Sequence, residues 1–189
     1  MPLSPMLKKL LFVRQFDIDK GKINLLGSAE VMLNASAILG LQEIDETKVY
    51  KAAKESSLKD ISGAVEHAKV YGKMREVFIE EIAELGKKIG QTDAGTIKTL
   101  QDIFNVYGLG EMAITNIDNA KKQAIISLRS STIAEAWQES NRTRAKKPVC
   151  SLTAGVLAGM FSFIFGKEVE CVEDKCKSQG NGYCLFKIG

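Results

Sequence analysis

The residues with the most chemical potential lie in the last forty positions of the chain. All four cysteines of the protein, Cys150, Cys171, Cys176 and Cys184, are found there, and Glu173 precedes Cys176 by three residues. Thiolates and a carboxylate brought together from separate segments can hold a tetrahedral zinc ion. The spacing predicts a metal site formed by Cys150, Glu173, Cys176 and Cys184.

This interpretation places a geometric condition on the chain around Glu173. In an unbroken strand, residues three apart point to opposite faces, so Glu173 and Cys176 can share an ion only if the strand ends or bulges between them. We expect that irregularity around Asp174 and Lys175. Cys171 would lie on the same strand face as Glu173 and is therefore an alternative ligand.

Two other interpretations of the cysteines stay open at this point. Free cysteines often act as small buried hydrophobic residues, and a single one can serve as a redox group or a nucleophile. The sequence has no Cys-x-x-Cys pair, which counts against a thioredoxin-like role.

The elements that must position these residues follow from apolar periodicity and turn residues. Strand pairs, predicted from hairpin-like turns, are separated by groups of helices rather than alternating with single helices. This order favours an α+β fold with antiparallel sheets and segregated helices. The predicted strands are residues 10–16, 23–26, 109–117, 123–128, 169–173 and 183–188, with 30–33 as a short strand or a helix start. The predicted helices are residues 35–44, 46–71, 74–89, 92–107, 131–139 and 153–165.

The last of these helices is apolar nearly all round, so we expect it to be buried or to lie in an interface. Gly155 and Gly159, four residues apart, leave a flat face where another backbone can approach, and that face is a candidate docking surface. Cys150 comes just before this helix. The partial positive charge of the helix N-terminus would favour its thiolate.

Size and charge narrow the class of protein. A chain of 189 residues is interpreted as one domain, with residues 1–45 as an N-terminal strand and helix segment within it. The net charge of +3 is modest, so neither nucleic acid nor a membrane surface is indicated as a partner. The densest basic segment, residues 142–147, is interpreted as a solvated loop ahead of the metal site. The uncharged run from residue 151 to 166 is short for a bilayer span, and the N-terminus shows no secretion signal, so a cytoplasmic protein is expected.

Several motifs together resemble the 4-vinyl-reductase-like domain, in the form of an archaeal stand-alone protein. The likeness is strongest from residue 108 to 189 and looser, in element order only, before that. It is carried by Lys147-Pro148-Val149-Cys150, Thr153 to Gly159, Phe165 to Val169, Glu173 to Cys176 and Gly180 to Phe186.

This resemblance implies an α+β ligand-binding fold shared with sensor domains for aromatic effectors and with vesicle-tethering subunits. It also implies a homodimer, a small apolar pocket, and zinc held by Cys150, Glu173, Cys176 and Cys184, with Cys171 outside the pattern. The pocket residues of the family do not carry over by motif. We expect a pocket in the region of Phe104, Tyr107, Trp137 and Phe161.

The favoured function is a zinc-stabilised module that binds or senses a small hydrophobic or aromatic molecule. An assembly protein of the same fold is one alternative, and a reductase, as the family name suggests, is another. A reductase needs a hydride or electron source, and the sequence carries neither a Gly-x-Gly-x-x-Gly after a strand nor a flavin signature. We therefore expect a closed structural metal site rather than a catalytic one.

Overall fold

The computed structural model describes residues 16–19, 22–25, 28–70, 101, 104–105 and 107–189. The predicted helices at 74–89 and 92–107 and the predicted strand at 10–16 lie wholly or almost wholly outside these ranges. Of the described helices, none combines the length and the apolar composition that a bilayer crossing requires.

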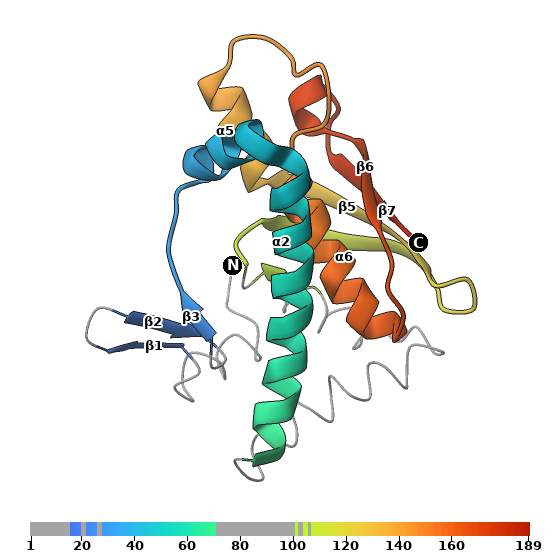
Figure 1. Cartoon of the computed structure of the whole chain (residues 1–189). Helices are drawn as coiled ribbons and strands as arrows, with labels where there is room; N and C mark the ends of the chain where they lie inside the picture. The colour runs from blue at the N-terminus through green and yellow to red at the C-terminus, as the bar shows by residue number, and fades with distance from the viewer. Residues whose placement is uncertain (1–15, 20–21, 26–27, 71–100, 102–103, 106) are drawn as a thin grey trace.

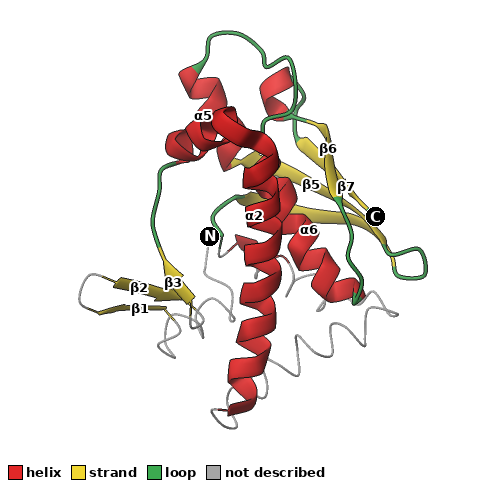
Figure 2. Ribbon diagram, in the orientation of Figure 1, coloured by secondary structure: helices red, strands yellow, loops and turns green. Residues whose placement is uncertain are grey.

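Two antiparallel sheets and three α-helices make up the described chain (Figure 2). The first sheet is a meander of β1 (Phe16–Asp19), β2 (Lys22–Leu25) and β3 (Ser28–Glu30). The second has the order β4-β5-β7-β6, with β4 at Gly110–Asp118, β5 at Gln123–Ser131, β6 at Cys171–Lys175 and β7 at Cys184–Ile188. Helices and antiparallel strands are segregated, as the α+β prediction requires.

The long helix α2 (Ala35–Val70) is broken at Asp45, whose backbone leaves the helical region with φ −158° and ψ 89°. Asn34 begins the first part by accepting a hydrogen bond from the Ala37 amide at 2.8 Å. Asp45 begins the second part in the same way, through the Lys48 amide at 2.9 Å. Both are N-cap bonds, so the two predicted helices at 35–44 and 46–71 are confirmed as two segments of one element.

Helix α6 (Ser151–Phe165) forms the centre of the molecule, between α2 and the four-stranded sheet (Figure 1). Twelve of its fifteen residues are buried, which explains why its sequence is apolar on every side. It begins directly after Cys150, two residues earlier than predicted, and ends at Gly166 in the left-handed region with φ 60°. Helix α5 (Thr132–Ser140) and the 3-10 turn η1 (Lys177–Gln179) lie near its first turn.

The flat glycine face of α6 contacts α2 of the same chain. A Cβ atom at Gly155 would lie 2.4 Å from the Tyr50 carbonyl oxygen, and one at Gly159 would lie 2.3 Å from the Lys54 carbonyl oxygen. Ser57 of α2 also donates a hydrogen bond to the Val156 carbonyl at 3.1 Å. The expectation that this face is an external docking surface is therefore wrong, because α2 already occupies it.

Polar side chains hold α2 and the start of β6 together at the far end of this contact. Lys54, which is buried, donates to Glu168 at 2.9 Å and to Glu170 at 2.6 Å. Tyr50 donates to the other oxygen of Glu170 at 2.5 Å and accepts from the Cys171 amide at 3.0 Å. These bonds hold the pKa of Glu170 below its usual value, first through Lys54 and then through Tyr50.

Candidate metal centre

The strand register brings the candidate ligands to one face of the sheet. Cys184 pairs with Leu128 of β5, and Glu173 pairs with Phe186 of β7. Between Glu173 and Lys175 the register shifts, so that Lys175 lies opposite Leu185. One extra residue on β6 thereby turns Cys176 back to the face of Glu173, next to Cys184. The predicted bulge around Asp174 and Lys175 is confirmed.

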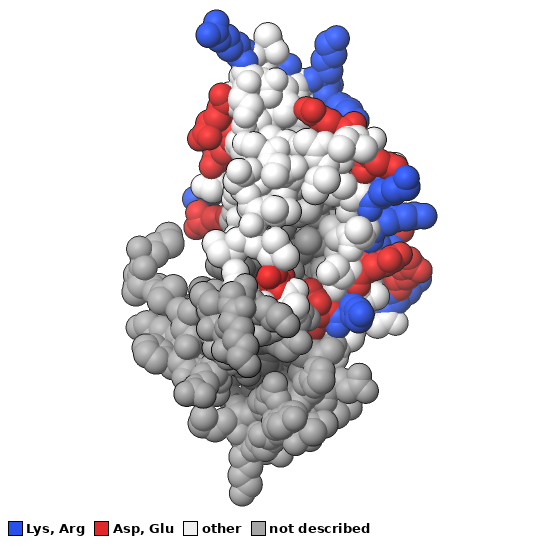
Figure 3. All heavy atoms as spheres, turned by 60° about the vertical axis from the view of Figure 1, so that its left-hand side comes forward, with Lys and Arg blue, Asp and Glu red and all other residues white. Residues whose placement is uncertain are grey.

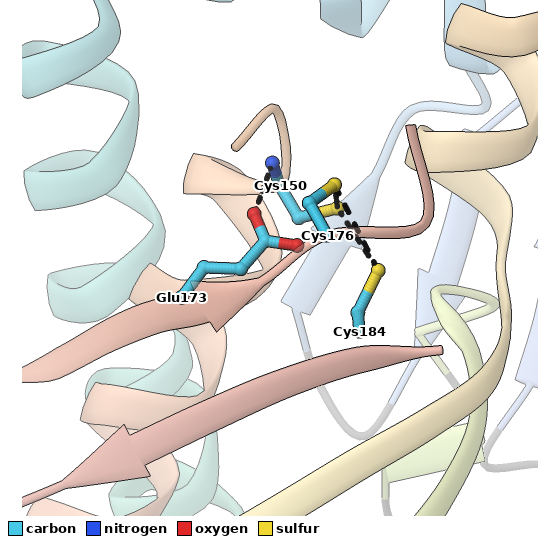
Figure 4. A group of neighbouring side chains, drawn as sticks. All are labelled: Cys150, Glu173, Cys176 and Cys184. Atoms are coloured by element: carbon cyan, nitrogen blue, oxygen red, sulfur yellow. Dashed lines mark hydrogen bonds between the residues drawn. The ribbon is translucent and has the colours of Figure 1, made fainter. Parts of the chain in front are cut away.

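Three sulfur atoms form a nearly equilateral triangle. The Sγ atoms of Cys150, Cys176 and Cys184 are 3.9 Å apart in all three pairs (Figure 4). A disulfide requires about 2.05 Å, so the three cysteines are free thiols. In a tetrahedral zinc site with Zn–S bonds of about 2.3 Å, sulfur atoms lie about 3.8 Å apart. The triangle therefore has the dimensions of one face of such a site.

Glu173 supplies a fourth donor to the same point. Its Oε2 accepts a hydrogen bond from the Cys150 amide at 2.9 Å, which fixes the carboxylate at the start of α6. Its Oε1 is buried and has no hydrogen-bond partner among the described residues. Figure 4 shows this second oxygen turned toward the sulfur atoms. One carboxylate oxygen and the three sulfurs lie within 4.8 Å of one another, so the cluster can bind a metal ion.

The electrostatics of the cluster are those of a site that lacks a positive charge. Burial, followed by the proximity of Cys176, raises the pKa of Glu173 to about 8. Hydrogen bonding to Cys176 raises the pKa of the Cys150 thiol, whereas hydrogen bonds from Cys150 and Cys184 lower the pKa of Cys176. One thiolate can therefore be shared by two thiols, but three thiolates and a carboxylate need a cation between them.

Neighbouring donors stabilise negative charge on the sulfurs. The Lys177 amide donates to the Cys184 sulfur at 3.3 Å. The Ser178 hydroxyl lies 3.0 Å from the Cys176 sulfur, and the Ser131 hydroxyl lies 3.4 Å from the Cys150 sulfur. Such outer contacts orient metal ligands and reduce their charge. The lysine side chains nearby act elsewhere: Lys177 pairs with Glu135 at 2.6 Å, and Lys147 pairs with Glu46.

Cys171 is buried but does not belong to this group. It precedes Glu173 by two strand positions, about 6.6 Å along β6, and pairs with Ile188 near the other end of the sheet. The group of ligand-type atoms found among the described residues does not include its sulfur. The structure thus does not bring the alternative ligand to the cluster.

The four residues expected in a pocket fall into two groups. Phe104 and Phe161 are fully buried in the core, and burial raises the pKa of the half-buried Tyr107 to about 12. Trp137 alone lines a described pocket, of about 490 Å³. We call this cavity the Trp137 pocket; it lies between the first segment of α2 (residues 39–46), Trp137, and residues 145–149 with Ser151.

Two residues that the sequence analysis missed join the Trp137 pocket to the metal cluster. Gln42 donates to the Val149 carbonyl at 2.9 Å and accepts from the Leu152 amide at 2.8 Å. Glu46 accepts from Ser151 at 2.5 Å and from Lys147. Both side chains satisfy groups around the first turn of α6, on either side of Cys150. Polar positions one and two turns after the apolar Ile38 and Leu39 were the available signal.

The fold and the cluster define an α+β domain with a buried group of three cysteines and one glutamate. Residues 131–189, which include all four of these residues, match the vinyl-4-reductase (4VR) domain family. The chain thus contains a domain of this family, and the resemblance to 4-vinyl-reductase-like proteins is confirmed.

Relatives by sequence come from Methanocaldococcus jannaschii. The uncharacterized protein MJ1460 is 26% identical over 121 residues, which cover 63% of this chain and 72% of that protein. Three further uncharacterized proteins of the same organism match over 22%, 51% and 62% of their own lengths.

Similar solved structures include the phenol-responsive sensory domain of the transcription activator PoxR, crystallised with phenol. It has a TM-score of 0.66 and 18% identity, and the match covers 98% of this chain and 90% of that chain. A vinyl-4-reductase family protein from M. jannaschii has a TM-score of 0.46 at 20% identity, covering 82% and 75%. Subunit 3 of a trafficking protein particle complex from Naegleria fowleri, bound to palmitic acid, has 0.43 at 13%, covering 83% and 82%. The expected fold class is confirmed.

Proposed function

We propose that this protein is a zinc-stabilised small-molecule-binding module with a closed, structural metal site. The observation that carries the metal proposal is the unpartnered, buried Oε1 of Glu173 beside three sulfurs 3.9 Å apart. A buried carboxylate oxygen without a partner is costly, and a cation at that point would satisfy it.

Zinc suits this donor set better than the other common metals. Three thiolates with one carboxylate are ligands that Zn²⁺ accepts in tetrahedral geometry, whereas calcium and magnesium require oxygen ligands. All four positions would be filled by Cys150, Glu173, Cys176 and Cys184, which leaves no position for water or substrate. When bound, zinc supplies cross-linking: it ties β6, η1 and β7 to the first turn of α6.

The small-molecule part of the proposal is supported by the fold. The sensory domain of PoxR shares this architecture over nearly the whole chain and is phenol-responsive. By analogy we propose that the present protein binds a small hydrophobic or aromatic molecule and acts as a homodimer in the cytoplasm. The metal centre would then hold one wall of the binding region in place through Cys150 and its neighbours.

Native mass spectrometry of protein purified without added metal tests the metal proposal. We expect one zinc per chain in the wild type and in Cys171→Ala, which removes a buried sulfur outside the cluster. We expect none in Cys176→Ser, together with a lower melting temperature. Wild-type protein without metal that also fails to take up added zinc would overturn the proposal, as would full zinc content in Cys176→Ser.

The binding proposal is tested separately from the metal. Native mass spectrometry reveals any co-purifying small molecule, and a melting-temperature shift with millimolar phenol tests an aromatic ligand directly. A protein that carries no small molecule, and whose melting temperature is unchanged by phenol and by a panel of other small aromatic compounds, would contradict the sensing role while leaving the metal site intact.

A further inference from the structure

The Trp137 pocket has the size and the walls of a ligand site. Its volume of about 490 Å³ falls within the range of about 300–1,000 Å³ typical of small-molecule pockets. Leu39, Pro148 and Val149 provide apolar wall, and the half-buried Trp137 contributes an indole ring. A mixed wall of this kind fits a small organic molecule.

The polar groups of the inner wall are already satisfied by the protein. Both ends of the Gln42 amide are bonded to backbone at Val149 and Leu152. Both oxygens of Glu46 accept hydrogen bonds, from Ser151 and from Lys147. These residues shape the wall and hold it rigid, but they offer a ligand no unused bond. The aromatic ring and the charges at the rim are left to recognise it.

The rim is formed by the basic segment that the sequence analysis interpreted as a solvated loop. Arg142, Arg144, Lys146 and Lys147 place four cationic side chains within six residues. In the described part of the chain, Lys147 is the one that has a carboxylate partner. Lys146 lines the pocket, is exposed and has no partner there. Figure 3 shows basic side chains at the upper end of the face, above a broad uncharged area.

The balance of charge favours an anion. Glu43 also lines the pocket, but it is a single exposed carboxylate on the α2 side. Against it stand Lys146, the two arginines of the same loop, and the partial positive charge of the α6 N-terminus at Ser151. A cationic ligand would meet more repulsion than attraction at this rim.

We propose that the Trp137 pocket binds a planar aromatic anion, with its ring against the indole of Trp137 and its acidic group beside Lys146. The inference rests on the proposed small-molecule function and names its site and ligand class.

Isothermal titration calorimetry with 2-naphthoate, and with the uncharged 2-naphthalenemethanol, tests both halves of the inference. Trp137 is the only tryptophan in the chain, so its fluorescence reports occupancy of this pocket directly. We expect Trp137→Ala to weaken both compounds about tenfold and Trp137→Phe to retain most of the affinity. We expect Lys146→Gln to weaken 2-naphthoate about threefold, to leave 2-naphthalenemethanol unchanged, and to remove most of the salt dependence.

Lys167→Gln is the matched control, because Lys167 is an exposed lysine beyond the other end of α6. Zinc content and circular dichroism of each variant verify that it is folded. Equal 2-naphthoate affinity in wild type and Trp137→Ala would overturn the location but leave the binding function standing. Equal effects of Lys146→Gln and Lys167→Gln would overturn the anionic class. Wild-type protein that does not bind 2-naphthoate below about 1 mM would overturn the inference, whereas a co-purifying molecule would still support the function.

Discussion

Replacing Gly159 by alanine tests the contact on which the central layers depend. The added Cβ would lie 2.3 Å from the Lys54 carbonyl oxygen, 3.0 Å from the Leu58 nitrogen and 3.1 Å from the Ser57 Cβ. Ordinary contacts begin near 3.4 Å, so α2 and α6 must separate by about 1 Å at this point. The clashing atoms are mainly backbone and cannot rotate away.

The expected cost follows from two opposing effects. Overpacking a tight interior costs about 1–3 kcal/mol, and the upper end applies where backbone must move. Alanine is favoured over glycine in a helix by about 1 kcal/mol, which offsets part of this cost. We therefore expect Gly159→Ala to lower the free energy of unfolding by about 2 kcal/mol, a large share of the roughly 5–15 kcal/mol typical of a domain.

Gly40→Ala provides a matched control. Gly40 is also helical, in the first segment of α2, but no atom of the described chain lies within 4 Å of a Cβ placed there. We expect this variant to gain about 0.5–1 kcal/mol. Urea unfolding followed by the fluorescence of Trp137 measures both. If the two alanine variants showed the same midpoint with equal slopes, the reasoning about the α2–α6 contact would be refuted.

Four further outcomes are expected. Cys176→Ser should lose zinc and about 3 kcal/mol or more of stability by urea unfolding, because one missing ligand opens a closed site. Glu173→Gln should keep the bond to the Cys150 amide but weaken zinc affinity about tenfold or more in a chelator competition, and unchanged affinity would exclude the carboxylate as a ligand. Zinc should be released as pH falls below about 6, because protons compete for the thiolates, and release at high pH would contradict thiolate coordination. Lys54→Met should lower the melting temperature at pH 7 but much less at pH 3. The pKa of Glu170 is lowered in the folded protein, so the stability from this ion pair is present above pH 4.5 and is lost as pH falls through the folded-state value.

The sequence predicted the parts of the structure that depend on local rules. Asn34 and Asp45 are capping residues, and both begin helical segments where the pattern placed them. The bulge before Cys176 followed from the two-residue period of a strand together with the assumption of a shared ion. The start of α6 was misplaced by two residues, because Cys150 occupies the N-cap position without a side-chain capping bond.

The features that could not be predicted depend on partners distant in sequence. The small face at Gly155 and Gly159 indicated that a backbone approaches, but not that it belongs to α2 of the same chain. Phe104 and Phe161 carry the apolar pattern of a pocket wall, and the same pattern describes the filled core in which they lie. Gln42 meets α6 across more than one hundred residues, and no local pattern indicates such a bond.

The single additional residue in β6 means that this part of the chain is constrained in length as well as in composition. Side chains on a strand alternate, so removing Asp174 would restore a regular ladder and turn Cys176 to the opposite face from Cys184, with every ligand still present in the sequence. Removing or inserting one residue would therefore be more damaging here than removing or inserting two. Among related sequences, we expect the odd or even number of residues between Glu173 and Cys176 to be kept more strictly than the identity of those residues.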